Sequence, residues 1–387
     1  MGGHHHHRGT PTEESRLHRT AALVIVAPLV LVTVAALAWL WPPASAVQRG
    51  EGAAPELTGQ VTEILVEPCP AGTPDDVERC GRVRVQLDEG EEAAAPLPSG
   101  LGSPEVEVGQ DVVLIRSETP DGVSYAVVDH QRETGLWLVG LAFVLALVAF
   151  GRWRGVAALV GLAATFGMLA VFVIPAILAG SPPVLVAIVG SAAVALVALY
   201  VTHGFGLTTT VAVLGTLTSL ALTGALSAVS VTALHLTGVT DDLSASVGTS
   251  QGIDVRGLLL AGIIIGSLGV LDDVTITQAA TVAEIARADP SAGFRRLYQP
   301  GSRVGRAHVA SVVNTIVLAY AGASLPLLVL LVADNGSLTA VLPSQVIAQE
   351  IVRSAAATIG LIAAVPITTA LAAWALRNRE PAGTANR

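Results

Sequence analysis

The sequence predicts an all-α polytopic membrane protein of about eight transmembrane helices, with a small extracytoplasmic β domain inserted between the first and second helices. Three observations lead to this prediction. The chain of 387 residues is 52% hydrophobic and only 13% charged, and its apolar residues fall in runs long enough to cross a bilayer. A polar block rich in Gly, Pro and acidic residues interrupts these runs between Pro42 and Thr134. Outside that block, arginines cluster in alternate connections, as short cytoplasmic connections require.

The N-terminal segment, 1–20, is polar, contains arginine and is predicted to be a disordered cytoplasmic tail. Its four consecutive histidines, His4 to His7, could bind a metal ion loosely or have no specific role. The following apolar run, 21–41, is long enough for the ~30 Å hydrocarbon layer and ends in two tryptophans. We expect it to be the first transmembrane helix. A secretory signal is the alternative, although its apolar core would be shorter.

The polar block is expected to fold as an extracytoplasmic β domain over 50–132. Short alternating segments such as GRVRVQLDE and VSYAVVDHQ lie between Gly and Pro residues, a pattern typical of four or five half-buried strands in a small barrel or sandwich. The only two cysteines, Cys69 and Cys80, lie in this block and are expected to form one disulfide in an oxidising compartment. Two unpaired structural cysteines are the alternative. The CxxC spacing of redox and zinc sites is absent.

The remaining apolar residues predict a seven-helix membrane domain over 135–376, followed by a cytoplasmic tail at 377–387. Only Arg256 and Arg353 fall in its short outer connections, so we expect both termini to be cytoplasmic. The inner connection from Glu284 to Arg306 is expected to mix a short helix with loops, because it contains two prolines. The seven apolar segments lie at about 135–151, 155–178, 184–202, 208–236, 257–279, 307–333 and 346–376.

Two adjacent aspartates, Asp272 and Asp273, lie inside the membrane-length segment GSLGVLDDVTITQAATVAEIA. A carboxylate near a bilayer centre costs at least ~2.5 kcal/mol, so such residues usually face a protein interior, a cavity or a partner charge. Adjacent helical residues point about 100° apart. Asp273 therefore shares a stripe with Thr277 and Glu284, whereas Asp272 shares the neighbouring stripe with Thr275.

These stripes predict an ion or substrate site, because carboxylates and hydroxyls can bind a cation or relay protons. Asp273 is favoured, since its stripe is the more polar. The alternative is structural: one aspartate caps the following helical segment and the other pairs with an arginine. The predicted binding residues are Asp272, Asp273, Thr275, Thr277, Gln278 and Asn314, with Arg306 and Tyr320 in gating or pairing.

Several other residues of the membrane domain can be explained by structural roles. Asn314 could bind the ion or simply hold helices together by hydrogen bonds. The many hydroxyls of 208–236 are expected to bond carbonyls of the preceding helical turn. Glu350 and Arg353, three positions apart, are expected to form a local ion pair. Pro326 is expected to kink its helix.

Signature motifs of ATPases, zinc proteases and serine hydrolases are absent from the sequence, so we expect no enzymatic activity and no cofactor. No long basic cluster occurs, which argues against nucleic acid as a partner. The expected partners are the lipid bilayer, an inorganic ion or small solute, and a protein partner at the β domain. Energy for transport would come from an ion gradient or from a partner.

Two stretches, GSLGVLDDVTITQAATVAEI and GSRVGRAHVASVVNTIVLAYAGASLPLLVL, resemble the YibE/F-like family of bacterial multi-pass membrane proteins over about 130–375. In that family an acidic residue follows the Gly-Arg pair of the second stretch. Here Ala307 follows Arg306, so the role of that acid is absent or replaced. The residues that match the family pattern are Asp272, Asp273, Thr275, Gln278, Arg306, Asn314 and Tyr320.

The resemblance implies a multi-pass protein of the bacterial inner membrane with a permease-like character. We therefore expect a transporter or permease-like protein with an ion or solute site near the paired aspartates. The alternative function is a non-transporting membrane scaffold or envelope sensor whose β domain binds a partner. In that case the aspartates would only hold helices together.

Overall fold

The computed structural model of the chain describes residues 13–43, 55–70, 79–100, 102–119, 122–239, 242–335 and 342–377. The chain divides into two units. One comprises Met1–Val47 with Gly151–Arg387, and the other is Gln48–Phe150. The histidine run at His4 to His7 and the tail beyond 377 lie outside the described residues.

The β domain is a five-stranded antiparallel sheet in the order β3-β2-β1-β4-β5. The edge strands β3 and β5 also contact each other, which curls the sheet toward closure. This strand order and closure are those of a Greek-key barrel of the OB type. The strands are β1 (Glu56–Glu67), β2 (Cys80–Leu87), β3 (Glu92–Pro96), β4 (Asp111–Thr119) and β5 (Gly122–His130).

The long first strand, β1, lets the small sheet curl because it pairs with two neighbours. Its first half pairs with β4, and most of its length pairs with β2. A bulge between Val61 and Glu63 bends the strand where these pairings separate. Alternate residues then point into one core, as the sequence pattern predicts. That core comprises Val61, Val83, Val85, Leu87, Ala93, Ala95, Leu97, Val106, Val112, Leu114 and Val127.

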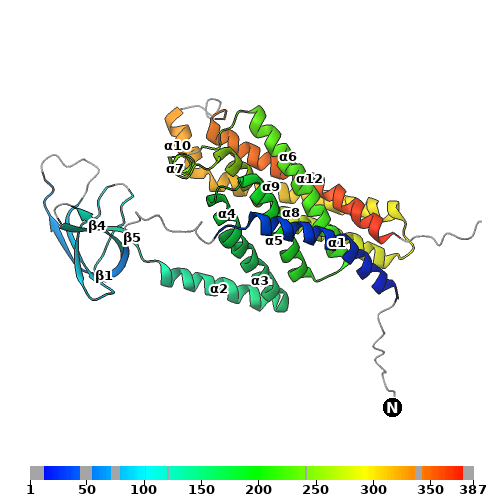
Figure 1. Cartoon of the computed structure of the whole chain (residues 1–387), viewed down its shortest axis with the longest axis horizontal. Coiled ribbons are helices and arrows are strands. Elements are labelled where there is room, and N and C mark those ends of the chain that lie inside the picture. Colours follow the sequence, from blue (N-terminus) through cyan, green and yellow to red (C-terminus); the bar gives the residue numbers. More distant parts are fainter. Residues whose placement is uncertain are drawn as a thin grey trace, which may run out of the picture. The chain divides into compact units, whose positions relative to one another are not determined.

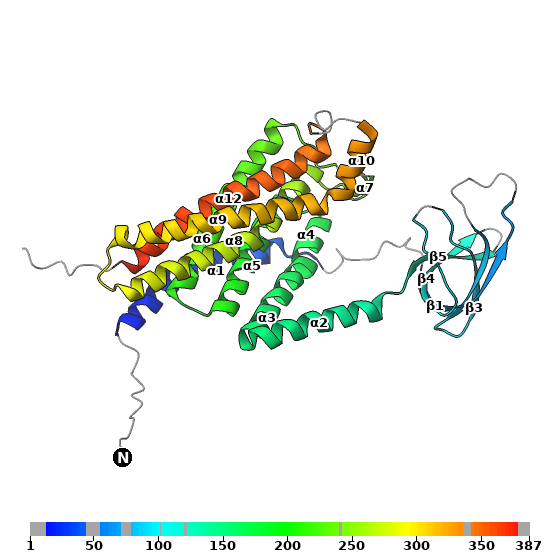
Figure 2. The ribbon, with the colours of Figure 1, turned by 180° about the vertical axis from the view of Figure 1, so that it is seen from behind.

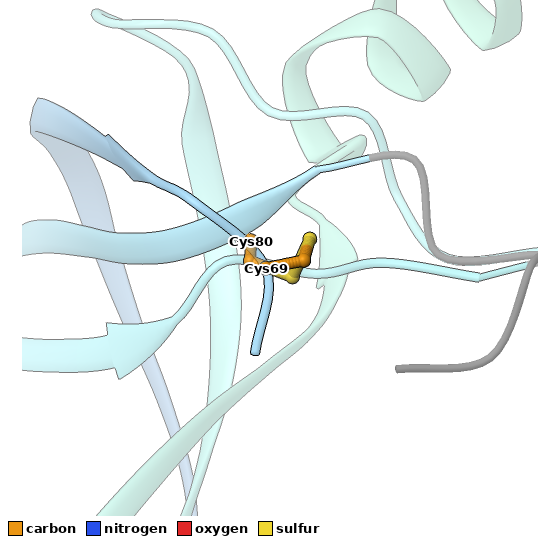
Figure 3. Close-up of a disulfide and its surroundings, with 2 residues drawn as sticks. All are labelled: Cys69 and Cys80. Carbon is orange, nitrogen blue, oxygen red and sulfur yellow. A yellow bond between two sulfur atoms is a disulfide. The ribbon is translucent and has the colours of Figure 1, made fainter. Parts of the chain in front are cut away.

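The two cysteines form a disulfide, which confirms the pairing expected from the sequence (Figure 3). The sulfur atoms of Cys69 and Cys80 are 2.02 Å apart, and their Cα atoms are 5.1 Å apart. The bridge ties the residues that follow β1 to the first residue of β2.

Within the described part of the chain, eight helices are long and apolar enough to cross a membrane, which agrees with the number of helices that the sequence predicts. They are α1 (Glu13–Leu40), α2 (Glu133–Gly151), the continuous run α3 (Trp153–Met168), η2 (Leu169–Val173) and α4 (Ile174–Leu178), then α5 (Pro183–His203), α6 (Leu207–Ala233), α8 (Val255–Ala288), α9 (Phe294–Ala323) and α12 (Gln345–Leu376). Two shorter helices are α7 (Asp242–Gln251) and α10 (Leu325–Asn335).

Helix α8 is the centre of the larger unit, where it packs against α5, α6, α9 and α12 (Figures 1 and 2). Small residues let these helices approach closely. A Cβ atom added at Gly360 of α12 would lie 1.8 Å from Oγ1 of Thr223 in α6. A Cβ atom added at Gly215 of α6 would lie 2.3 Å from Oγ1 of Thr368 in α12. The α6–α12 contact therefore depends on glycine packed against hydroxyl-bearing side chains.

A π-helical turn, η2, interrupts the helix that begins with α3. The amide of Ile174 donates to the carbonyl of Leu169, one residue further back than in an α-helix. The cause is Pro175, which has no amide hydrogen and whose ring would collide with the carbonyl four residues before it in a regular helix. The widened turn presses against α5 at Gly190, where an added Cβ would lie 2.8 Å from Cγ2 of Val173.

The connection between α8 and α9 differs from the mixture of short helix and loops that the sequence predicts. Helix α8 continues to Ala288 and α9 begins at Phe294, which leaves a turn over 289–293. Oδ1 of Asp289 accepts hydrogen bonds from the amide of Ser291 (3.1 Å) and from its hydroxyl (2.6 Å), and so fixes the turn. Pro300 is accommodated inside α9. At the other end, α9 stops at Ala323 and α10 follows, where the sequence predicted a kink.

Acid is expected to loosen this turn. The Ser291 hydroxyl, followed by the Ser291 amide and Arg296, lowers the pKa of Asp289 below its ordinary value. A folded-state pKa below the unfolded one means that the stabilisation is present above the ordinary Asp value of about 3.9 and is lost as the pH falls further. Hydrogen exchange of the 289–297 amides, corrected for intrinsic rates, should show this loss of protection. The same pH dependence in Asp289→Asn would contradict the assignment.

Candidate functional site

The paired aspartates of α8 face different surroundings. The Asp272 side chain is partly buried, and its Oδ1 atom is shielded from solvent with no hydrogen-bond partner. Asp273 is exposed and interacts electrostatically with His203 at the end of α5. The two carboxylates thus lie on separate stripes. Burial directs attention to Asp272, whereas the polarity of the sequence stripe favoured Asp273.

A cleft of about 220 Å³ opens beside Asp272, and we call it the Asp272 cleft. Its walls come from α3 and η2 on one side, α5 on another and α8 on the third. The lining residues are Thr165, Leu169, Val173, Gly190, Ser191, Val194, Ala198, Ile265, Gly266, Leu268, Gly269 and Asp272. Most of these are apolar, so the few oxygen atoms determine what the cleft can bind.

Two buried oxygens at the Asp272 cleft have no hydrogen-bond partner. Besides Oδ1 of Asp272, the hydroxyl of Ser191 is unpaired, and this residue is only 2% exposed. An unsatisfied buried polar group costs about 1–3 kcal/mol, so it usually has a functional or missing partner. Both atoms belong to residues that line the same cleft. The presence of two unpartnered oxygens in one cleft supports the interpretation of the cleft as a binding site.

The structure does not support the structural alternative for the aspartates. Helix α8 runs through both positions to Ala288, so neither aspartate caps a new helix. Among the described residues, no ion pair includes Asp272 or Asp273. A pairing with arginine, which would make the carboxylates purely structural, is thus not formed in this part of the chain.

Two threonines connect the main chain at Asp272 to α6. The Thr216 hydroxyl of α6 lies 2.6 Å from the Thr275 hydroxyl of α8. The Thr275 hydroxyl in turn donates to the main-chain carbonyl of Asp272 over 3.1 Å. Both threonines are fully buried. Thr275 is therefore placed next to Asp272, as its sequence stripe predicts.

Gln278 lies away from the Asp272 cleft, in a contact between three helices. Its Nε2 atom donates to the carbonyl of Gly301 in α9 (2.8 Å) and to Oγ1 of Thr369 in α12 (2.7 Å). A Cβ added at Gly305 would lie 2.6 Å from its Oε1 atom. The GSRVG segment of α9 is thus a GxxxG surface that admits the Gln278 amide. The arrangement gives Gln278 a helix-packing role.

Replacing Gln278 by leucine is expected to destabilise the protein by about 1–2 kcal/mol, because two buried hydrogen bonds between helices are lost. Thermal unfolding in detergent measures the change. Thr281→Val is the matched control, since its exposed hydroxyl only bonds Thr277 within α8. Equal melting temperatures for the two variants would contradict the packing role.

The other predicted residues are not gathered at the cleft. Thr277 is exposed on α8, and Asn314 and Arg306 are exposed on α9. Tyr320 is partly buried, and its hydroxyl packs at Gly266, a residue that lines the cleft. Tyr320 also interacts electrostatically with Glu350 and Arg353. Those two form the ion pair expected from the sequence, at 2.8 Å.

Sequence reasoning missed Ser191 and the π turn, and it assigned Thr216 to packing. Ser191 follows Gly190 in an otherwise apolar helix, and such a pair was the available signal.

A larger groove of about 400 Å³ lies between α1, α5, α6 and α8, but its walls are almost entirely apolar. It offers no comparable chemistry. Among the described residues, no group of three or more His, Cys, Asp or Glu side chains could hold a metal ion.

Comparison with known proteins identifies one family. The family model described as YibE/F-like protein matches residues 139–378, which is more than half of the chain and includes the whole Asp272 cleft. No curated protein and no solved structure matches the chain.

Proposed function

The chain belongs to the YibE/F-like family, and from this premise we propose that it is a membrane transporter or permease-like protein. The Asp272 cleft is its binding site for an ion or a small solute. The protein lies in the bacterial inner membrane with both termini in the cytoplasm. The β domain lies outside the cytoplasm, where it caps the membrane domain or docks a protein partner. Transport, and no enzymatic step, is the proposed activity.

The observation that carries this proposal is the pair of unpartnered oxygens, on Asp272 and Ser191, in one cleft among membrane-length helices. Ionisable groups at such depth are rare, and they mark ion and substrate pathways. The π turn forms part of the wall and supplies an element that can change shape, because π turns concentrate at functional sites.

The orientation is supported by charge and by redox chemistry. Arginines in the short connections favour a cytoplasmic location for both termini. The Cys69–Cys80 disulfide favours an oxidising compartment for the β domain. The two lines of reasoning are independent, and they agree.

Currents from proteoliposomes test the proposal. Rapid jumps in NaCl, KCl, MgCl₂ or acid are expected to give transient currents with the wild-type protein for at least one of these probes. Asp272→Asn should abolish the current, and Asp273→Asn, its matched control one position along α8, should retain it. Melting temperatures of both variants verify folding.

Two outcomes would contradict transport through the Asp272 cleft. One is an Asp272→Asn current equal to that of the wild type. The other is the absence of current with all four probes, combined with a loss of the protein's function in cells when the β domain is deleted. The second outcome would favour the scaffold or sensor alternative.

A further inference from the structure

The Asp272 cleft is elongated along α5 and α8. A Cβ atom added at Gly257 of α8 would lie 3.4 Å from Cδ of Pro183, the first residue of α5, so the two helices run in the same direction from this contact. Asp272 and Ala198 lie equally far along their helices from it, and therefore at the same level. Ser191 precedes Ala198 by about two helical turns, or about 10 Å along the helix axis. The two unpartnered oxygens, on Asp272 and Ser191, thus lie near opposite ends of the cleft.

A second acceptor lies at the Asp272 end. Gly161 of α3 packs against Ala198, where an added Cβ would lie 3.9 Å from the Ala198 Cα atom. Thr165, one turn later on α3, is therefore at the level of Asp272, and it lines the cleft. Its hydroxyl donates to the Gly161 carbonyl over 3.0 Å, which leaves the lone pairs of the oxygen free to accept. A carboxylate and a hydroxyl oxygen can thus both accept hydrogen bonds at this end.

The middle of the cleft is apolar. Leu169, Val194, Leu268 and Gly269 line it between the two polar ends. The volume of about 220 Å³ is several times the ~30 Å³ that one water molecule occupies in the liquid, so the cleft holds a molecule of several heavy atoms. A hard divalent cation takes six or more oxygen ligands, which these aliphatic walls do not supply. The walls instead favour an aliphatic chain.

The charge at each end of the cleft selects the groups of the ligand. Asp272 is the single charged residue among those that line the cleft, and among the described residues it has no ion pair. A buried carboxylate requires a counter charge, and a primary ammonium group brings one together with three N–H donors. The Ser191 hydroxyl is neutral, so a second ammonium group or a carboxylate at that end would be left without a counter charge. The matching group there is neutral and forms hydrogen bonds.

We propose that the Asp272 cleft binds a linear aliphatic monocation, with its ammonium group at Asp272 and Thr165 and a neutral hydrogen-bonding group at Ser191. The proposal rests on the proposed function, because it names the class of solute that the cleft binds. Such a ligand supplies partners to both unpartnered oxygens and covers the apolar walls between them. Asp272 is partly exposed, so a rotation of its carboxylate turns Oδ1 toward the ligand. Inorganic cations compete for the same carboxylate.

Thermal unfolding of the full-length protein in detergent tests the proposal, because a ligand that binds the folded state raises the melting temperature. The probe is aminopentanol at neutral pH, which carries one ammonium and one hydroxyl group on an aliphatic chain. It should raise the melting temperature in a saturable manner. Pentanol, which has no charge, and NaCl at equal ionic strength should not. Pentylamine, which has no hydroxyl, should bind more weakly than aminopentanol.

Variants assign the binding to the two ends of the cleft. Asp272→Asn should abolish the shift caused by aminopentanol, and Asp273→Asn should retain it. Gly269→Leu, which fills the middle of the cleft without a collision, should abolish it as well. Ser191→Ala should weaken aminopentanol binding by about threefold to tenfold, the worth of one hydrogen bond, and leave pentylamine binding unchanged. The melting temperatures without ligand show whether each variant is folded.

The proposal is overturned if aminopentanol causes no saturable shift, or if the shift is the same in Asp272→Asn and Gly269→Leu as in the wild type. An Asp272-dependent shift with NaCl or MgCl₂ but not with the amine would also overturn it, in favour of an inorganic ion. Equal binding of aminopentanol and pentylamine would overturn the role of Ser191. Failure of the proposed function has a different signature. There amine binding would depend on Asp272, while proteoliposome currents would be unaffected by Asp272→Asn.

Discussion

Replacing Gly269 by leucine is expected to stop transport and leave the fold intact. Gly269 lines the Asp272 cleft one helical turn before Asp272, and a Cβ atom added there has no neighbour within 4 Å. The leucine side chain can therefore fill part of the 220 Å³ space without a collision. Narrowing the space around the bound ion should reduce proteoliposome currents by about tenfold or more.

The stability of Gly269→Leu should be equal to or higher than that of the wild type. Leucine has a higher helix propensity than glycine, by up to about 1 kcal/mol. Gly262→Leu is a matched control on the same helix. It also has open space around its Cβ, but it does not line the Asp272 cleft. Equal currents from the two variants would show that the cleft is not on the transport path.

Replacing Gly360 by valine is expected to cause the largest loss of stability. Even the first carbon of a side chain at this position would lie 1.8 Å from Oγ1 and 3.1 Å from Cβ of Thr223. Thr223 is fully buried and bonds the Ser219 carbonyl at 2.9 Å, so it has little room to rotate. Helices α6 and α12 must separate, and overpacking of this kind costs about 3 kcal/mol or more.

A compensating substitution distinguishes this collision from a general effect on α12. The smaller change Gly360→Ala places only a Cβ atom against Thr223 and should also be destabilising. Thr223→Ala removes the hydroxyl and methyl groups that this atom meets, and it should restore most of the stability that Gly360→Ala loses. Thermal unfolding of the single and double variants measures the coupling between the positions. Strictly additive effects would show that Gly360 does not act through Thr223.

Local sequence patterns were sufficient to predict the membrane-length helices and the strands, but not the short helix α7. Apolar runs and alternating segments encode spans and strands directly, and eight described helices and a five-stranded sheet correspond to them. The disulfide followed from having only two cysteines. The prediction for the α8–α9 connection was wrong, because it treated Pro290 and Pro300 as helix breakers. Pro300 lies inside α9, and only the turn around Pro290 is irregular.

The site was only partly predictable. Helical geometry separated Asp272 from Asp273, but which of them faces a cleft depends on α3 and α5, whose sequences lie far from α8. The polarity of a stripe cannot reveal that contact. Ser191 looked like an ordinary small residue in a buried helix. The role of Gln278 was also hidden, because its partners are the carbonyl of Gly301 and the hydroxyl of Thr369.

The most direct test of the Asp272 cleft is its access to water during transport. The protein has no cysteine besides the Cys69–Cys80 disulfide, so a single introduced thiol reports alone. Ser191→Cys in proteoliposomes should react with a charged methanethiosulfonate reagent, and the reaction should stop the current. Leu222 lies on an exposed apolar face of α6, which we expect to contact lipid. Leu222→Cys should therefore stay unreactive, because the charged reagent does not enter the bilayer. If Ser191→Cys reacts no faster than Leu222→Cys and the current persists, the cleft is not the transport site.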